Sequence, residues 1–160
     1  MRAADLLLLA FDHAWGHRWE SLSEVLKGLT PEEAAWQAPA YAGAEHEAGW
    51  PRPGTIHWQV AHVAHCKRHY TEFLTQRDRS GRPPAPPRPP DLDWAAERAG
   101  LEAAHAAQRI AIAGLSDADL GAQVGNAMSV AEFVAMCTRH DVWHAAQIAV
   151  ARRLYRTRAR

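Results

Sequence analysis

The feature that most restricts the fold of this chain is a proline-rich stretch, residues 77–91, which separates two segments with helical periodicity. It holds six of the ten prolines. Proline lacks an amide hydrogen and clashes with the preceding turn, so this stretch cannot be helical and favours an extended polyproline conformation. At about 3.1 Å per residue, it can run the length of a helical bundle. The helices before and after it can therefore point in the same direction, joined by a long crossover.

Four long segments carry apolar residues at the three- and four-residue spacing of a helix that is buried on one side. They are residues 4–29, 56–76, 93–115 and 129–155. No segment shows the alternation of a strand, and no repeat recurs at the period of a solenoid. The chain has 160 residues, of which 48% are hydrophobic, which is enough for one core. The sequence therefore predicts an all-α fold in a single domain, residues 1–160.

The connections between these segments have their own signals. Thr30-Pro31-Glu32-Glu33 and Ser129-Val130-Ala131-Glu132 are capping-box sequences. The first has proline at the first helical position, which predicts a short helix through Trp36. Residues 37–54 are predicted as loop and residues 116–119 as a capped turn.

The charge balance excludes some partners. Lys plus Arg and Asp plus Glu both total 18, so no overall field attracts nucleic acid or an acidic membrane. No apolar stretch approaches the roughly 20 residues that span a bilayer. Two distant cysteines do not form a disulfide framework, which fits a reducing cytoplasm.

His140 and His144 lie four residues apart on the apolar stripe of the fourth predicted helix, which they share with Phe133 and Leu154. Burying two imidazoles there costs free energy unless each nitrogen finds a partner, and one divalent cation can satisfy both. The spacing therefore predicts a metal site. The alternative is two helix histidines, one hydrogen-bonded inside and one at the surface.

A third ligand is expected from another helix, because metal sites that do chemistry generally use three protein ligands and keep one position open. The second predicted helix offers His57, His62, His65 and His69. His62 lies roughly 90° from the mean direction of the apolar face, nearer to it than the other three. Its ring can lean toward a neighbouring helix, which makes His62 the predicted third ligand.

Two motifs resemble those of the DinB-like superfamily of YfiT-type metalloproteins, which is unrelated to the DNA polymerase that shares the name. The first is residues 56–70, Ile-His-Trp-Gln-Val-Ala-His-Val-Ala-His-Cys-Lys-Arg-His-Tyr, similar to the second-helix motif. The second is His140-Asp141-x-x-His144-x-x-Gln147-Ile148, similar to the fourth-helix signature. The resemblance covers nearly the whole chain, including the long crossover.

This resemblance implies a four-helix bundle of up-down-down-up topology, with the proline-rich crossover between helices two and three. It also implies metal ligands at His62, His140 and His144. Characterised members are largely transferases that use low-molecular-weight thiols, and others are described as metal-dependent hydrolases. Members are often homodimers, so a homodimer is expected here.

Further residues are candidates for a pocket beside these ligands. Trp58 and Trp143 are next to the predicted ligands and could form an aromatic wall. Asp141 and Gln147 could orient a ligand or the substrate, because ligating histidines usually donate their second nitrogen to an oxygen. His105 is predicted as a satisfied interior or rim histidine, with a place in the pocket as the alternative.

Arg18 interrupts the apolar face of the first predicted helix, beside Trp15. Either its stem packs on the core with the charged end in water, or it contacts an anion inside the pocket. Cys66 and Cys137 are predicted as small buried hydrophobes. For Cys137, which lies one turn before His140, a thiolate ligand or redox role is the alternative.

The favoured hypothesis is a metal-dependent enzyme of the thiol S-transferase type. Three neutral imidazoles leave zinc, or nickel or iron in its place, with its full charge, which acidifies a bound water or thiol and polarises an electrophile. A small thiol would displace the water, ionise and attack a small electrophilic substrate. The alternatives are a metal-dependent hydrolase and a metal-binding or stress-response module without turnover.

Overall fold

The computed structural model describes residues 2–37, 50, 52–76, 83, 87, 90–125 and 128–158. It is mostly helical, which confirms the predicted all-α class. The four long helices are α1 (Ala3–Gly16), α4 (Ile56–Thr75), α5 (Trp94–Ala113) and α6 (Val130–Thr157). Two short helices, α2 (Leu22–Val25) and α3 (Pro31–Ala35), lie between α1 and α4 in the sequence. Most of the predicted loop 37–54 and of the proline-rich stretch 77–91 lies outside the described residues.

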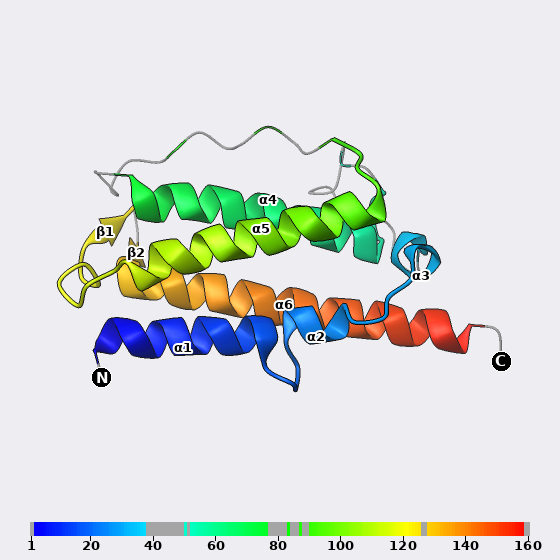
Figure 1. The fold of residues 1–160 in the computed structure, drawn as a ribbon, viewed down its shortest axis with the longest axis horizontal. Helices are drawn as coiled ribbons and strands as arrows, with labels where there is room; N and C mark the ends of the chain where they lie inside the picture. Colours follow the sequence, from blue (N-terminus) through cyan, green and yellow to red (C-terminus); the bar gives the residue numbers. More distant parts are fainter. Residues whose placement is uncertain are drawn as a thin grey trace.

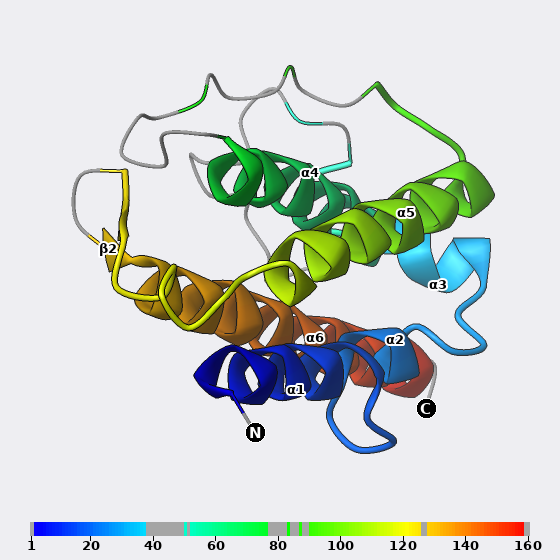
Figure 2. The same cartoon turned by 60° about the vertical axis from the view of Figure 1, so that its left-hand side comes forward.

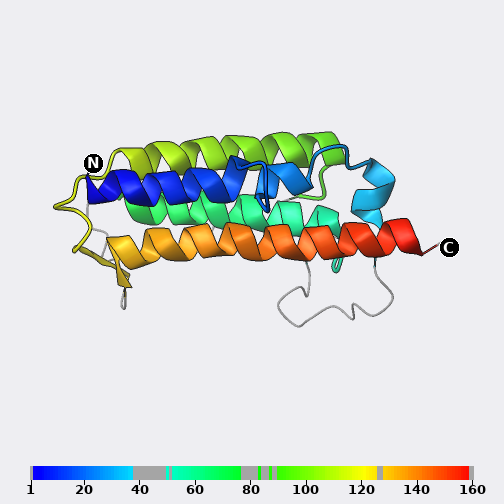
Figure 3. The same cartoon turned by 90° about the horizontal axis from the view of Figure 1, so that it is seen from below.

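The long helices pack as two pairs. Helix α4 packs most extensively against α5, and α1 packs against α6 (Figure 2). In Figure 1, α1 and α6 run from left to right, whereas α4 and α5 run from right to left. Figure 3 shows from below that α1 and α6 begin at the same end of the molecule. Helix α5 therefore begins at the end opposite to the one where α4 stops.

Several helix starts lie where the sequence predicts them. Both capping boxes form, with reciprocal hydrogen bonds between Thr30 and Glu33 before α3 and between Ser129 and Glu132 before α6. Thr55 caps α4 through its hydroxyl. Such caps satisfy amides that have no partner within the helix, which fixes the first turn. Within the described part of the chain, no helix combines the length and the apolar character needed to cross a bilayer.

The prediction of one continuous first helix over residues 4–29 is wrong. Helix α1 ends at Gly16, and the chain turns before α2 begins at Leu22. Glycine has low helix propensity, and Glu20 in this turn has a φ of 58°, a left-handed value that ends a right-handed helix. Phe11 and Leu22, on the two sides of this break, are both fully buried. The apolar pattern therefore continues across the break and does not reveal it.

Two short strands precede α6, although the sequence predicts none. β1 (Gln123–Val124) pairs with β2 (Met128–Ser129) in antiparallel register. Each strand is only two residues long, which is too short to show alternation in the sequence. Residues 116–120 form the turn predicted there, and the Asp119 carboxylate accepts hydrogen bonds from the Ser116 amide and hydroxyl.

The apolar core consists of two clusters, one toward each end of the helices. The first includes Phe11, Phe73 and Phe133, and the second includes Leu22 and Ile148. Between these clusters, the middle of the helices buries polar side chains. They are Gln59, Lys67, His105, Gln108, Asp141 and His144. The candidate site lies at this polar level of the molecule.

Candidate metal centre

Four potential metal ligands from α4 and α6 converge at this level. The ring centroid of His62 lies 5.5 Å from that of His140 and 5.0 Å from that of His144, and the two α6 rings are 4.5 Å apart. The Cys66 Sγ lies 3.5 Å from the His62 Nε2. One donor atom each from His62, Cys66 and His140 lies within 4.8 Å of the other two. The structure thus brings the three predicted histidines together and places a cysteine beside them.

Each helix contributes two donors separated by one turn. His62 and Cys66 on α4 are four residues apart, as are His140 and His144 on α6, and this spacing places both members of a pair on one face. Cys66 is half-buried and touches His62, so its description as a small buried hydrophobe misses its surroundings. The four-residue spacing from His62 is the signal that could have identified it.

The separations between the donors suit a tetrahedral ion. With Zn–N bonds of about 2.0–2.1 Å, and about 1.1 Å from the nitrogen to the ring centre, two imidazoles on one ion have centroids about 5 Å apart. The three histidine pairs are 4.5, 5.0 and 5.5 Å apart. A thiolate sulfur and an imidazole nitrogen on one zinc ion are about 3.6 Å apart. The 3.5 Å between Cys66 and His62 matches this value. The donor atoms of His62, Cys66 and His140 lie close enough together to hold a metal ion, and the His144 ring lies beside this group.

Gln59 fixes the orientation of His144. Both side chains are buried, and the His144 Nδ1 hydrogen-bonds the Gln59 Oε1. An amide oxygen can only accept, so Nδ1 carries the proton and Nε2 carries the lone pair that a metal needs. Metal-binding histidines are commonly held in this way by a second group. The sequence predicts Asp141 or Gln147 for such a role and not Gln59, whose only signal is its place one turn before His62.

Burial favours the uncharged forms of His140 and Cys66. Burial, with smaller contributions from His62 and Lys67, lowers the pKa of His140 to about 4. Burial likewise raises the pKa of Cys66 to about 11. Tyr70, whose ring meets the His140 ring edge-on at 5.6 Å, also has its pKa raised by burial. Neutral imidazole is the form that binds a metal, so His140 is ready to bind at neutral pH.

A cavity of about 430 Å³ opens beside the histidines. Trp58 stacks on His62 with ring centroids 5.0 Å apart, and Arg139 brings a positive charge to the lining. The lining residues are Trp58, His62, Met136, Arg139, His140, Trp143, His144 and Gln147. A small molecule in this cavity would contact the proposed ligands directly.

The six candidate pocket residues separate into two groups. Trp58, Trp143 and Gln147 line the cavity, whereas Arg18, His105 and Asp141 do not. Arg18 is exposed in the turn after α1, where its guanidinium carbon lies 5.0 Å from the centre of the Trp19 ring. The early end of α1 explains this position, because the face on which the sequence places Arg18 stops two residues before it.

Asp141 belongs instead to a second polar cluster inside the core. Its carboxylate lies 2.6 Å from the Lys67 Nζ, and each side chain is only 1% exposed. The same ammonium donates to the Gln108 Oε1 at 3.2 Å. Burial raises the pKa of Asp141, while the neighbouring Lys67 opposes that rise. The ion pair joins α4 to α6, and Gln108 adds α5.

His105 completes this cluster from α5. Its ring stacks between Phe11 and Trp15 of α1, with centroid distances of 5.0 and 3.9 Å. The Lys67 Nζ lies 4.7 Å from the centre of the Phe11 ring. Burial lowers the pKa of His105 to about 3, and its Nδ1 has no hydrogen-bond partner among the described residues. His105 is therefore a neutral interior histidine packed between aromatic rings.

Comparison with known proteins adds one finding to this geometry. The family model of the DinB superfamily matches residues 14–148, which is most of the chain and includes all four proposed donors. No curated protein and no solved structure matches the chain.

Proposed function

This chain belongs to the DinB superfamily, and we propose that it holds a divalent transition metal through His62, His140 and His144 for thiol-dependent transfer to a small electrophile. The observation that carries this proposal is the convergence of three imidazole rings, from two helices, on the wall of one cavity. Their centroid separations suit a single ion. Zinc is the first choice, with nickel or iron as substitutes, because imidazole suits all three.

We propose the family's up-down-down-up four-helix topology for this chain as well. Its support is the direction of the four long helices, since α1 and α6 oppose α4 and α5. The connection from the end of α4 to the start of α5 must then run the length of the molecule. The proline-rich composition of residues 77–91 suits a crossover of that length.

The residues around the cavity have separate roles in the proposed reaction. When bound, a divalent ion with three neutral ligands supplies a positive charge that acidifies a thiol and polarises an electrophile. Gln59 holds His144 in the metal-binding tautomer. Trp58 and Trp143 form apolar walls that limit water, while Arg139 offers a charge to an anionic group of either reactant.

Cys66 favours a second candidate function, a metal-binding module without turnover. A fourth ligand from the protein closes the coordination sphere, which is typical of structural rather than catalytic zinc sites. The donor atoms of His62, Cys66 and His140 lie close enough together for the thiolate to take part. The two functions therefore differ in whether the fourth position belongs to Cys66 or to an incoming thiol.

Metal analysis of purified variants tests the binding site. We expect one equivalent of metal in the natural protein and a loss of that metal in His62→Ala, His140→Ala and His144→Ala. His69→Ala is the matched control, because His69 lies on α4 but outside the group of donors, near Glu72. Full metal content in the three variants would refute both candidate functions.

Cobalt substitution then separates the two functions. A thiolate ligand gives cobalt an intense charge-transfer absorption that imidazole and water do not give. If this absorption is present before any thiol is added, and disappears in Cys66→Ser, the closed module is supported. If it appears only on titration with a small thiol, the transferase is supported, and a thiol-conjugation assay with small electrophiles follows.

A further inference from the structure

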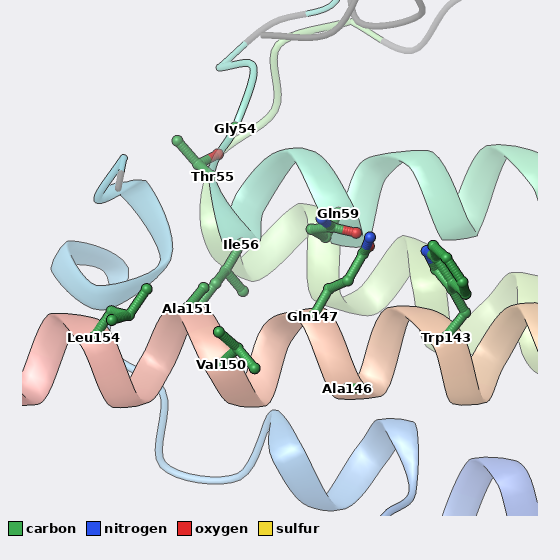
Figure 4. Close-up of a pocket in the computed structure, with 10 residues that line it drawn as sticks. All are labelled: Gly54, Thr55, Ile56, Gln59, Trp143, Ala146, Gln147, Val150, Ala151 and Leu154. Carbon is green, nitrogen blue, oxygen red and sulfur yellow. The ribbon is translucent and has the colours of Figure 1, made fainter. Parts of the chain in front are cut away.

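An apolar groove continues from the cavity along α4 and α6. Its volume is about 370 Å³, and it lies between the first turn of α4 and the second half of α6 (Figure 4). Ile56 lies on the α4 side, while Trp143, Val150 and Leu154 lie on the α6 side. These three α6 residues are large and exposed, at 66%, 59% and 47%. An exposed apolar patch of this kind commonly marks a binding site.

The groove is continuous with the proposed metal centre. Trp143 and Gln147 line both the groove and the histidine cavity. Gln59, which holds His144, also lines the groove. Figure 4 shows the amides of Gln59 and Gln147 near each other at the end of the groove that adjoins Trp143. A molecule lying in the groove would therefore pass these amides before reaching the histidines.

The size and chemistry of the groove suit a small molecule. Ligand pockets usually measure about 300–1,000 Å³ and combine an apolar lining with a few polar groups that fix orientation. This groove has aliphatic and aromatic walls and polar amides at the end near the metal centre. A stable protein partner usually contacts about 20–30 residues on each side, whereas ten residues line this groove.

We propose that the groove binds the apolar tail of an amphiphilic substrate whose polar, reactive head lies at the histidines. This rests on the proposed function and narrows its substrate to molecules that carry an alkyl or aryl chain beside the reacting group. Trp143, Val150 and Leu154 contact the chain, and the amides of Gln59 and Gln147 meet the start of the head group. The tail binds equally in either metal-dependent reaction, because it takes no part in the chemistry.

The test uses straight-chain hydroxamic acids, from acetohydroxamic to octanohydroxamic acid, titrated into zinc-loaded protein by calorimetry. The hydroxamate head binds the metal in every member, so only the length of the chain varies. We expect the affinity to rise about fourfold per methylene until the groove is full, the equivalent of about 0.8 kcal/mol for each buried methylene. In Ala146→Trp, whose new ring fills the groove, the rise should disappear while acetohydroxamic acid still binds.

Ala149→Trp is the matched control for this variant. Ala149 is also an exposed alanine of α6, but it lines a separate cavity beside Arg152. This variant should keep the dependence on chain length. Equal affinities along the series in zinc-loaded natural protein would overturn the groove proposal and leave the metal centre standing. Failure to load zinc would instead refute the proposed function.

A second copy of this chain is the competing occupant of the groove. The homodimer implied by the family resemblance remains a prediction, and light scattering on the same variants tests it. If Ala146→Trp dissociates a dimer that Ala149→Trp leaves intact, and affinity does not depend on chain length, the groove is a subunit interface and the tail proposal is wrong.

Discussion

The two polar clusters of this protein lie side by side in the sequence and differ in whether their groups complement one another. Lys67 and Asp141 form an ion pair of opposite charges, each 1% exposed, and Gln108 accepts a further hydrogen bond from the lysine. One residue before Asp141, His140 faces His62, so that two imidazole rings are opposed. A buried pair of opposite charges neutralises itself, whereas imidazole nitrogens that face one another bring together lone pairs that a cation can bind.

The surroundings of the two clusters also differ, because one is packed in the core and the other lines a cavity. The ion pair is packed under the aromatic rings of Phe11 and Trp15 in the core. The histidines line a cavity that a small molecule can enter. Opposite charges paired in the core suit a role in the fold, while imidazoles and a thiol gathered beside a cavity could hold a metal ion. This contrast can be tested at each cluster in turn.

The largest effect is expected from breaking the ion pair. Lys67→Met should lower the free energy of unfolding by about 3–5 kcal/mol, because it leaves a carboxylate buried without its partner. Urea unfolding of metal-free protein measures this change. The double variant Lys67→Met/Asp141→Leu should recover most of the loss, since it removes both charges. If the double variant is as unstable as the single one, the pair is not the self-neutralising unit described above.

Metal binding at the histidine cluster should stabilise the folded protein, by somewhat less than the loss of the ion pair destabilises it. At a free zinc concentration one hundred times the Kd, the free energy of unfolding should rise by about 2.7 kcal/mol, because the ion binds only the folded state. His140→Ala should show no such rise, although it folds. Thermal unfolding with and without zinc gives the comparison. An equal rise in His140→Ala would mean that zinc binds elsewhere.

The support of His144 by Gln59 should affect metal affinity. Gln59→Leu removes the acceptor for Nδ1, and loss of such an outer partner typically weakens metal binding by about 10–100-fold. Gln147→Leu is the control, because it removes the other amide of the cavity. Competition with a chromophoric chelator measures both affinities. Equal affinities in the two variants would remove Gln59 from the site.

The smallest expected effect is on the pH dependence of stability, and it comes from His105 in the core cluster. In the folded protein His105 stays neutral down to about pH 3. In the unfolded chain, it takes up a proton below its ordinary pKa of 6.5. The unfolded state therefore binds more protons between these values, and stability falls as the pH falls through that window.

His105→Phe keeps the stacked ring but cannot titrate, so it should escape this loss. At pH 5.5, relative to pH 8, the natural protein should lose about 1.4 kcal/mol more than the variant. Urea unfolding of metal-free protein at the two pH values measures the difference. Parallel behaviour of the two proteins would show that His105 is accessible to protons in the folded state.

Local signals explain what the sequence could predict. Capping residues such as Thr55 and Ser129 determine helix starts through contacts within one turn. The proximity of three histidine rings was predictable, because His140 and His144 recur at helical spacing and His62 lies at the edge of an apolar face. The break after Gly16 was not, since the apolar pattern continues across it.

Long-range partners explain the rest. Lysine is usually a surface residue. The burial of Lys67 is explained by its partner Asp141, which lies 74 positions later in the sequence. The same is true of Gln59, whose partner His144 is 85 positions away. Such pairs depend on how α4 and α6 lie against each other, which helical periodicity alone does not determine.

The Lys67–Asp141 ion pair restricts where residues can be inserted into the chain. Lys67 follows His62 by five positions, and Asp141 directly follows His140, so one relative placement of α4 and α6 serves both clusters. One residue inserted between His62 and Lys67 would rotate the two by about 100° and separate them by about 1.5 Å along the helix axis. The ion pair and the histidines could then no longer form together, whereas an insertion beyond the ends of these helices leaves that interval intact.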